Sequence, residues 1–159
     1  MSDTAANGSA EEPKGLVLNM QFLRDFSFEN PNAPNSLISM QQKQPEINVD
    51  MNVRHRPLDG RTYEAVLTIK GEAKNEDMAL FVVECDYGAV VTFGTDVPDE
   101  QIETLLVVEV PRLIFPYARK IVADGVQDGG FPPLLVNPID FRLLLAQKQA
   151  QAANGEADS

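Results

Sequence analysis

The sequence predicts an α+β fold in which a four-stranded antiparallel sheet precedes the helices along the chain. Two observations predict it: apolar and polar residues alternate over four segments between residues 16 and 93, and helical periodicity starts only after residue 97. Strands that precede helices, rather than alternating with them, are typical of the α+β class. The 159 residues suffice for one core-forming domain, which we expect to cover residues 15–148.

Four segments have the period of two that is typical of strands. In the first, polar residues that include Asp25 and Glu29 alternate with apolar ones, which predicts one polar and one apolar face. The fourth places Phe81, Val83 and Cys85 on its apolar face. The four predicted strands cover residues 16–29, 47–53, 63–73 and 78–93.

The connections between these segments favour antiparallel pairing. Asp59-Gly60 is a tight-turn motif between the second and third strands. The polar residues 74–77 form a short turn between the third and fourth. Residues 30–45 contain three prolines and are predicted to form a longer loop. A sheet with one apolar face needs a covering layer, which the later helices supply.

The helical region begins at Pro98, because proline is favoured at the first position of a helix. Apolar residues between 102 and 110 fall on one stripe. Pro111 and Pro116 lack the N–H that a helix interior requires, so we expect a kink or a break there. The pattern then continues to Gly129-Gly130, which predicts a long, kinked helix.

A last helix is predicted after Asn137, which is expected to be its N-cap with Pro138 at the first position. Residues 1–14 and 149–159 are small and polar, and we expect disordered tails. The first of these lacks the apolar region of a secretory signal. No run approaches the roughly 18 apolar residues of a membrane span, so a cytoplasmic protein without membrane insertion is expected.

The net charge of −11, from 24 acidic and 13 basic residues, excludes nucleic acid and anionic membranes as expected partners. Residues 75–111 contain no Lys or Arg but nine acidic residues. Two interpretations stay open for this stretch. It forms either a solvated face or a docking surface for a basic partner.

The residues that could perform catalysis are few. Cys85 is the only cysteine and lies on an apolar strand face, which predicts a buried, unreactive thiol. His55 is the only histidine and is predicted to lie solvated in a turn. One histidine and one cysteine cannot build a zinc site, so no metal, cofactor or catalytic residue is expected. The alternative is an enzyme that uses the acids near Glu84 and Asp86 on a cationic substrate.

Apolar residues also occur outside the strand pattern, at Met40, in residues 131–135 and in the last helix. A single sheet with one or two helices cannot cover all of them, so we expect an exposed groove or an oligomer interface.

Several segments resemble those of the SecB-type export chaperones, in matching order and spacing over residues 16–146. Individually these segments are weak indicators, but together they are specific. They are residues 25–34 (DFSFENPNAP), 44–46 (QPE), 63–67 (YEAVL), 113–119 (LIFPYAR) and 130–134 (GFPPL).

The resemblance implies an ATP-independent, cytosolic chaperone that binds unfolded precursor proteins and passes them to the SecA motor ATPase. It also implies a homotetramer, a dimer of dimers with helices between two sheets. The family often has a tryptophan where Lys43 stands here, so the aromatic part of its groove differs in this chain. An alternative within the same fold is a SecB-like chaperone with a narrow client, such as a toxin–antitoxin pair.

The resemblance further implies two sites. SecA is expected to dock on the outer, acidic face of the sheet, and clients are expected in an apolar groove under the last helix, which acts as a lid. The docking residues would be Asp25, Glu29, Val82 and Glu84, and the groove residues Met40, Ile47, Phe81, Phe131, Phe141 and Leu144.

Overall fold

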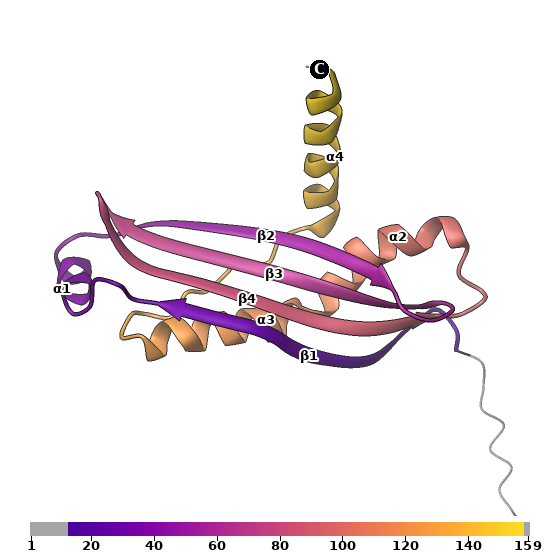
Figure 1. Cartoon of the computed structure of the whole chain (residues 1–159), viewed down its shortest axis with the longest axis horizontal. Coiled ribbons are helices and arrows are strands. Elements are labelled where there is room, and N and C mark those ends of the chain that lie inside the picture. The colour runs from indigo at the N-terminus through magenta and orange to yellow at the C-terminus, as the bar shows by residue number, and fades with distance from the viewer. Residues whose placement is uncertain (1–12, 158–159) are drawn as a thin grey trace, which may run out of the picture.

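The computed structural model describes residues 13–157, which form a sheet with two helices packed on one of its faces (Figure 1). The sheet has the order β1-β4-β3-β2, and every neighbouring pair is antiparallel. The predicted strand layer is therefore confirmed. Its strands are β1 (Leu16–Glu29), β2 (Glu46–Pro57), β3 (Thr62–Asn75) and β4 (Met78–Phe93).

Two tight hairpins join β2 to β3 and β3 to β4, at the predicted turns. Gly60 has a φ of 58° and Glu76 a φ of 52°, the left-handed conformation that such turns require. The connection between β1 and β2 contains a helix that the sequence did not predict, α1 (Asn35–Gln42). Eight residues between prolines show too little periodicity to indicate a helix, and one so short depends on tertiary packing.

Two β-bulges in β1 contradict the prediction that all its apolar residues share one face. The register with β4 shifts between Leu18 and Met20 and again between Leu23 and Asp25. Each bulge inserts one residue and reverses the side to which the following residues point. Met20 therefore lies opposite Val90 on the uncovered face and is 58% exposed.

The helical layer consists of α2 (Asp99–Val107) and α3 (Glu109–Asp128), separated at Val108. The break comes before both prolines rather than at them. Pro111 then lies in the first turn of α3, where its missing N–H costs nothing, and Pro116 lies within the helix. The predicted kink is confirmed, and its position is corrected.

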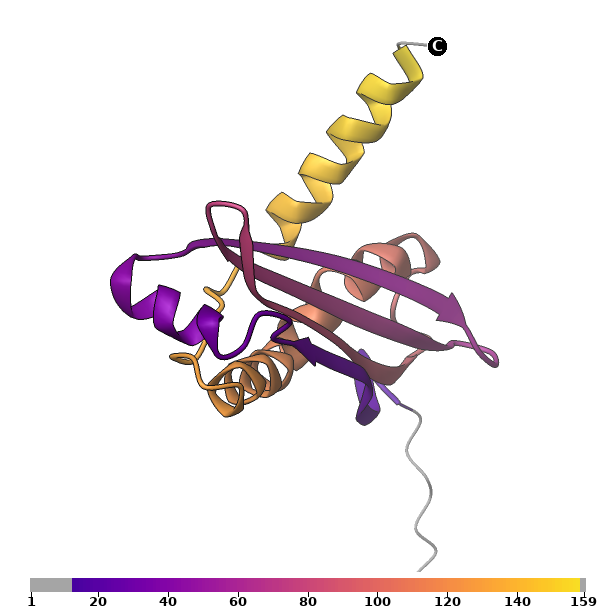
Figure 2. The same ribbon diagram turned by 60° about the vertical axis from the view of Figure 1, so that its left-hand side comes forward.

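The last helix, α4 (Phe141–Ala157), projects away from the sheet (Figure 2). Asp140, rather than the predicted Asn137, caps its first turn, because Oδ1 of Asp140 accepts a hydrogen bond from the backbone N–H of Arg142 at 2.9 Å. Residues 149–157 are helical, whereas the sequence predicted a tail from residue 149. Alanine and glutamine in this stretch favour the helix. The tail predicted for residues 1–14 lies almost entirely outside the described residues.

The core lies between α3 and the covered face of the sheet, here called the inner face. The predicted apolar parity of β4 is confirmed, because its odd-numbered residues are buried beneath the helix. The largest fully buried side chains include Leu67, Ile69, Phe81, Val83, Val91, Phe93, Leu106, Val110, Ile114 and Val122.

Within residues 13–157, no helix is both long enough and apolar enough to cross a membrane.

Candidate functional site

No helix in the described part of the chain covers the opposite, outer face of the sheet (Figure 1). Because the odd-numbered residues of β4 point to the inner face, its even-numbered residues point outward. Residues directly opposite one another on neighbouring strands point to the same side. The strand register therefore determines which side chains meet on the outer face.

Exposed carboxylates gather at the end of the outer face nearest α1. Glu29 of β1 and Glu72 of β3 both lie opposite Val82, on either side of β4, and Glu84 follows two residues along the strand. None of these carboxylates forms an ion pair within the described part of the chain. We use the name acidic surface for Asp25, Glu29, Glu72, Val82 and Glu84.

The acidic surface contains all four predicted docking residues, which β1 and β4 bring together. Their role in docking stays a prediction. Sequence reasoning missed Glu72, although the alternation of β3 could have indicated its outward direction.

Next to the acidic surface, three guanidinium groups surround two carboxylates; we call Arg24, Arg54 and Arg56 the arginine cluster. Oε1 of Glu64 accepts hydrogen bonds from Nη1 of Arg24 at 3.0 Å and from Nε of Arg56 at 2.9 Å. Nη2 of Arg54 lies 3.2 Å from Oδ2 of Asp86. The hydrogen bond from Arg56 is the main reason why the pKa of Glu64 is below its usual value, so this nearly buried carboxyl group stays ionised.

The inner face of the edge strand β2 is only partly covered, because α3 packs mainly across β4 and β3. Ile47 is 44% exposed and Val49 is 40% exposed. A cavity of about 460 Å³ lies between β2 and the start of α4, with Val49, Ile139 and Leu143 among its walls. We use the name apolar groove for Ile47, Val49, Met51, Ile139, Leu143 and Leu144.

The chain crosses the inner face between α3 and α4 and leads towards this groove. Leu134 packs over Gly71, where an added Cβ would come within 2.8 Å of Cδ2 of Leu134. Gly71 is paired with Val49 in the neighbouring strand. The glycine thus allows residues 131–136 to approach the sheet closely beside the groove.

The six predicted groove residues fall into two groups. Phe81 and Phe131 are buried, with ring centroids 5.0 Å apart, and Met40 is partly buried against the same core. Phe141 is also buried, against Phe115 at 6.2 Å. Ile47 and Leu144 belong to the apolar groove, and the part that all six play in client binding stays a prediction.

Sequence reasoning did not single out Val49, Ile139 and Leu143 for the groove. Their apolar character was visible, but their exposure depends on how far α3 extends over the sheet.

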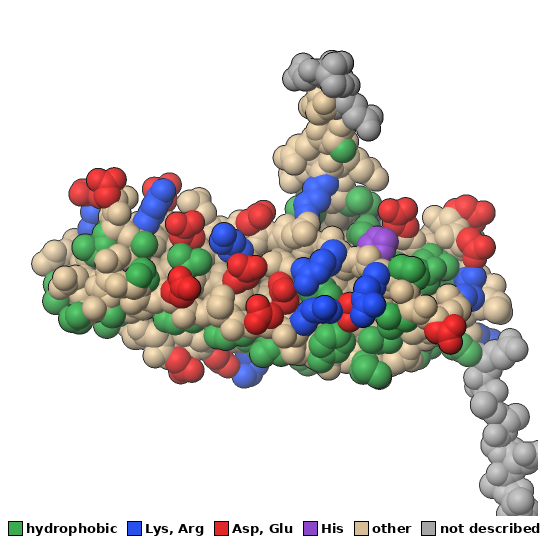
Figure 3. All heavy atoms as spheres, viewed as in Figure 1, with side chains coloured by type: hydrophobic (Ala, Val, Ile, Leu, Met, Phe, Trp, Pro, Cys, Tyr) green, Lys and Arg blue, Asp and Glu red, His purple; other side chains and the backbone are tan. Residues whose placement is uncertain are grey.

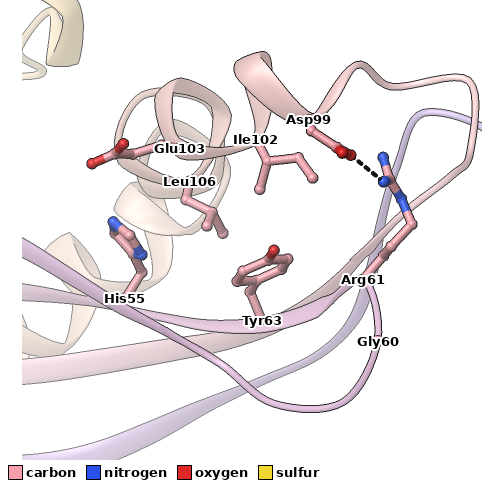
Figure 4. Close-up of a pocket in the computed structure, with 8 residues that line it drawn as sticks. All are labelled: His55, Gly60, Arg61, Tyr63, Asp99, Ile102, Glu103 and Leu106. Carbon is pink, nitrogen blue, oxygen red and sulfur yellow. Dashed lines mark hydrogen bonds and ion pairs between the residues drawn. The ribbon is translucent and has the colours of Figure 1, made fainter.

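A second cavity, of about 640 Å³, lies at the end of the sheet away from α1, between the β2–β3 hairpin and α2. Figure 4 shows that His55 and Tyr63 rise from the strands, and that Glu103 comes from α2. Asp99 is held by Arg61, whose Nη1 lies 2.6 Å from its Oδ1. His55 is exposed as predicted, but it lies in β2 opposite Ala65 rather than in a turn.

Cys85 is fully buried, as predicted. Burial, with smaller contributions from Asp86 and Asp25, raises the pKa of its thiol to about 11. Such a thiol is a poor nucleophile at neutral pH. Among the described residues, no three His, Cys, Asp or Glu side chains are grouped as a metal site requires.

Comparison with known proteins finds one family over nearly the whole chain. Residues 9–152 match the model of the family SecB, preprotein translocase subunit SecB. The protein-export protein SecB of Rhodospirillum centenum is 42% identical, over 97% of this chain and 96% of the relative. The corresponding protein of Afipia carboxidovorans is 43% identical, over 100% of this chain and 98% of the relative. That of Paramagnetospirillum magneticum is 44% identical, over 97% of this chain and 99% of the relative.

Among solved structures, a SecB-like chaperone of Mycobacterium tuberculosis, in complex with a ChAD peptide from the HigA1 antitoxin, has the same fold. The TM-score is 0.66 at 11% identity, and the match covers 79% of this chain and 91% of that one. The resemblance expected from the sequence is thus confirmed over the full fold. This chain belongs to the SecB family.

Proposed function

We propose that this protein is an ATP-independent chaperone of the cytoplasm that binds unfolded precursor proteins, keeps them competent for export and delivers them to SecA. Membership of the SecB family supports this function. The observation that supports it most directly is the apolar groove, in which Leu143 is 60% and Val49 40% exposed. Exposed apolar residues that line a cavity mark a binding surface.

Such a groove selects clients by their folding state. An unfolded chain presents apolar side chains that a folded protein hides. Met51, which is 7% exposed in the wall of the groove, would adapt its flexible side chain to different sequences. At the edge of the sheet, β2 also leaves backbone groups available to an extended segment.

We propose that SecA docks on the acidic surface. Its exposed carboxylates would attract a basic partner and orient it. The groove lies on the inner face and the acidic surface on the outer face, so a client and SecA would bind without competing. No catalytic step is part of this function.

We propose that the protein assembles as a homotetramer, a dimer of dimers, which requires two different interfaces per subunit. Two separate apolar surfaces are available for them. One is the open edge of β1, where Met20 and Leu23 are 58% and 47% exposed. The other is the solvent side of α3, where Leu113 and Tyr117 are 39% and 50% exposed.

Two single substitutions test whether client binding and SecA docking use separate surfaces. Leu143→Ser should weaken binding of a chemically unfolded precursor while SecA binding persists, and Glu84→Lys should have the reverse effect. Leu58→Ser is the matched control for the first change, because Leu58 is 43% exposed on the distant β2–β3 hairpin. Binding would be measured by fluorescence anisotropy, and light scattering would verify the assembly.

If either variant lost both partners equally with its assembly intact, the proposal of separate surfaces would be wrong. A narrow client, such as a toxin–antitoxin pair, is the alternative function. The distant structural neighbour supports only the fold, whereas the relatives at 42–44% identity are named for protein export. Identification of the chains that co-purify with the protein distinguishes many precursors from one client.

A further inference from the structure

The charges on the outer face are unevenly distributed: carboxylates prevail near α1, although Lys70 lies among them, and the three arginines lie together further along the sheet. In Figure 3, acidic side chains spread over the half of the face nearer α1, where some basic side chains also lie, and a group of basic side chains lies near the middle, below the base of α4. In the register, Glu84 of β4 lies opposite Lys70 of β3, and Arg54 of β2 lies opposite Val66, which is also in β3. Four residues of β3 separate these positions, which is about 13 Å along the strand.

The arginine cluster has hydrogen-bond donors in excess. Arg56 uses Nε and Arg24 uses Nη1, both on the same oxygen of Glu64. Among the hydrogen bonds of residues 13–157, no other N–H of these two side chains has an acceptor. The side chain of Arg24 is 46% exposed, and that of Arg56 is 62% exposed. These groups are accessible to an acceptor on a partner.

The protein holds the guanidinium groups in place. Arg54 donates to Oγ1 of Thr68 at 3.1 Å, and Thr68 donates to Oδ1 of Asp86 at 2.6 Å. Glu64, which anchors the other two arginines, is only 8% exposed. A preorganised guanidinium loses little conformational freedom when it binds a planar acceptor with two oxygens.

The balance of charge points to the kind of group that would bind. Three guanidinium groups surround Glu64 and Asp86, and Asp25 lies directly opposite Asp86, so three positive and three negative charges balance locally on a protein of net charge −11. The acidic surface beside the cluster would repel a polyanion such as nucleic acid. A single carboxylate on an otherwise basic partner satisfies both regions, and it matches the fork of a guanidinium group.

We propose that the arginine cluster binds a carboxylate of the same partner that docks on the acidic surface. The partner would then present basic groups and one carboxylate about 13 Å apart along the strand direction. This arrangement would fix the orientation of the partner on the sheet, which the acidic surface alone would not do. The inference rests on the proposed docking of SecA.

If the arginines had a purely structural role, their removal would change the Kd in the opposite direction from that expected for carboxylate binding. If they only neutralise Glu64 and Asp86, removal of one positive charge makes the face more acidic and strengthens its attraction for a basic partner. If Arg56 binds a carboxylate of the partner, the same change removes a charge-assisted hydrogen bond and weakens binding. The sign of the change in Kd separates the two roles.

The experiment measures the Kd of SecA for the full-length protein by calorimetry, at low and at physiological salt. We expect Arg56→Gln and, independently, Arg54→Gln to raise the Kd about tenfold. Lys70→Gln is the matched control, because it removes one positive charge from the same face without a role in the cluster. Its Kd should be unchanged or lower. Circular dichroism would verify that each variant is folded.

The outcomes distinguish this inference from the docking on which it rests. If Glu84→Lys weakens binding but both arginine variants bind as well as the wild type or better, the docking stands and the carboxylate site is wrong. If Glu84→Lys also leaves the Kd unchanged, the proposed docking surface is wrong and the carboxylate site falls with it.

Discussion

Nε of Arg56 lies 2.9 Å from Oε1 of Glu64, and Nη1 of Arg24 binds the same oxygen at 3.0 Å. The hydrogen bond from Arg56 does most to hold the pKa of Glu64 below its usual value of 4.5, although burial opposes it. The folded pKa is thus lower than the unfolded one. Ionised Glu64 therefore stabilises the fold above about pH 4.5, and this contribution is lost as the pH falls through the lower folded pKa.

Glu64→Gln should reduce the free energy of unfolding by about 1 kcal/mol at pH 7. The difference from the wild type should shrink as the pH falls below 4.5, because the unfolded wild type then binds a proton at Glu64, and it should vanish below the lower folded pKa, where the folded wild type is neutral there too. Urea denaturation of both proteins over a pH series measures this difference in the free energy of unfolding. Glu72→Gln, on the exposed acidic surface, is the control without ion pairs, and a constant difference for Glu64→Gln would contradict the assignment.

The thiol of Cys85 should not react with a disulfide reagent at pH 8 while the protein is folded. Its side chain is fully buried, and its pKa of about 11 leaves little thiolate. Reaction should become complete in denaturant, and its rate in native buffer should follow the population of open molecules. Rapid labelling that denaturant does not accelerate would show that the thiol is accessible in the fold.

Gly125→Ala should destabilise the protein, although alanine is normally the better helix former. A Cβ at Gly125 would collide with the ring of Phe26, where α3 packs on β1. We expect a loss of about 1–3 kcal/mol in the free energy of unfolding. Gly155→Ala in α4 is the matched control, because within the described residues its added Cβ would meet no atom within 4 Å beyond its chain neighbours and the backbone of its own helix. That change should stabilise the helix slightly, and equal effects at both sites would refute the steric argument.

Leu113→Asp should reduce the number of subunits without unfolding the subunit. Leu113 is 39% exposed on the side of α3 that faces away from the sheet, so the single subunit tolerates a charge there. An apolar interface would not, because the carboxylate would be buried without a partner. Light scattering measures the assembly, and Leu58→Asp on the distant hairpin is the control. An unchanged mass for Leu113→Asp would exclude this side of α3 as an interface.

Local patterns in the sequence were sufficient for most secondary structure. The strands follow from alternation, and the turns at Gly60 and Glu76 follow from short polar connections. The inner-face parity of β4 was predicted correctly because that strand has a neighbour on each side and a helix across it. The family resemblance was equally visible in short segments, and the comparisons confirm the family.

The position of the sites was only partly predictable. Asp25, Glu29, Val82 and Glu84 were assigned to the outer face from the resemblance and strand parity, and the register brings them together. The apolar groove was predicted to exist, but only Ile47 and Leu144 of its six residues were named. Exposure of a residue such as Val49 depends on which surfaces α3 leaves uncovered, and no local pattern encodes that.

By itself, the sequence determined the family, the excess of acidic charge and the order and type of every element except α1, because these depend on residues close together in the chain or on composition. Only the tertiary structure decided which side chains meet. The bulges of β1 reverse its faces through pairing with β4, and Arg24 reaches Glu64 across 40 residues of chain. Such contacts arise from register and packing between distant segments, and therefore the arginine cluster becomes visible only in the folded sheet.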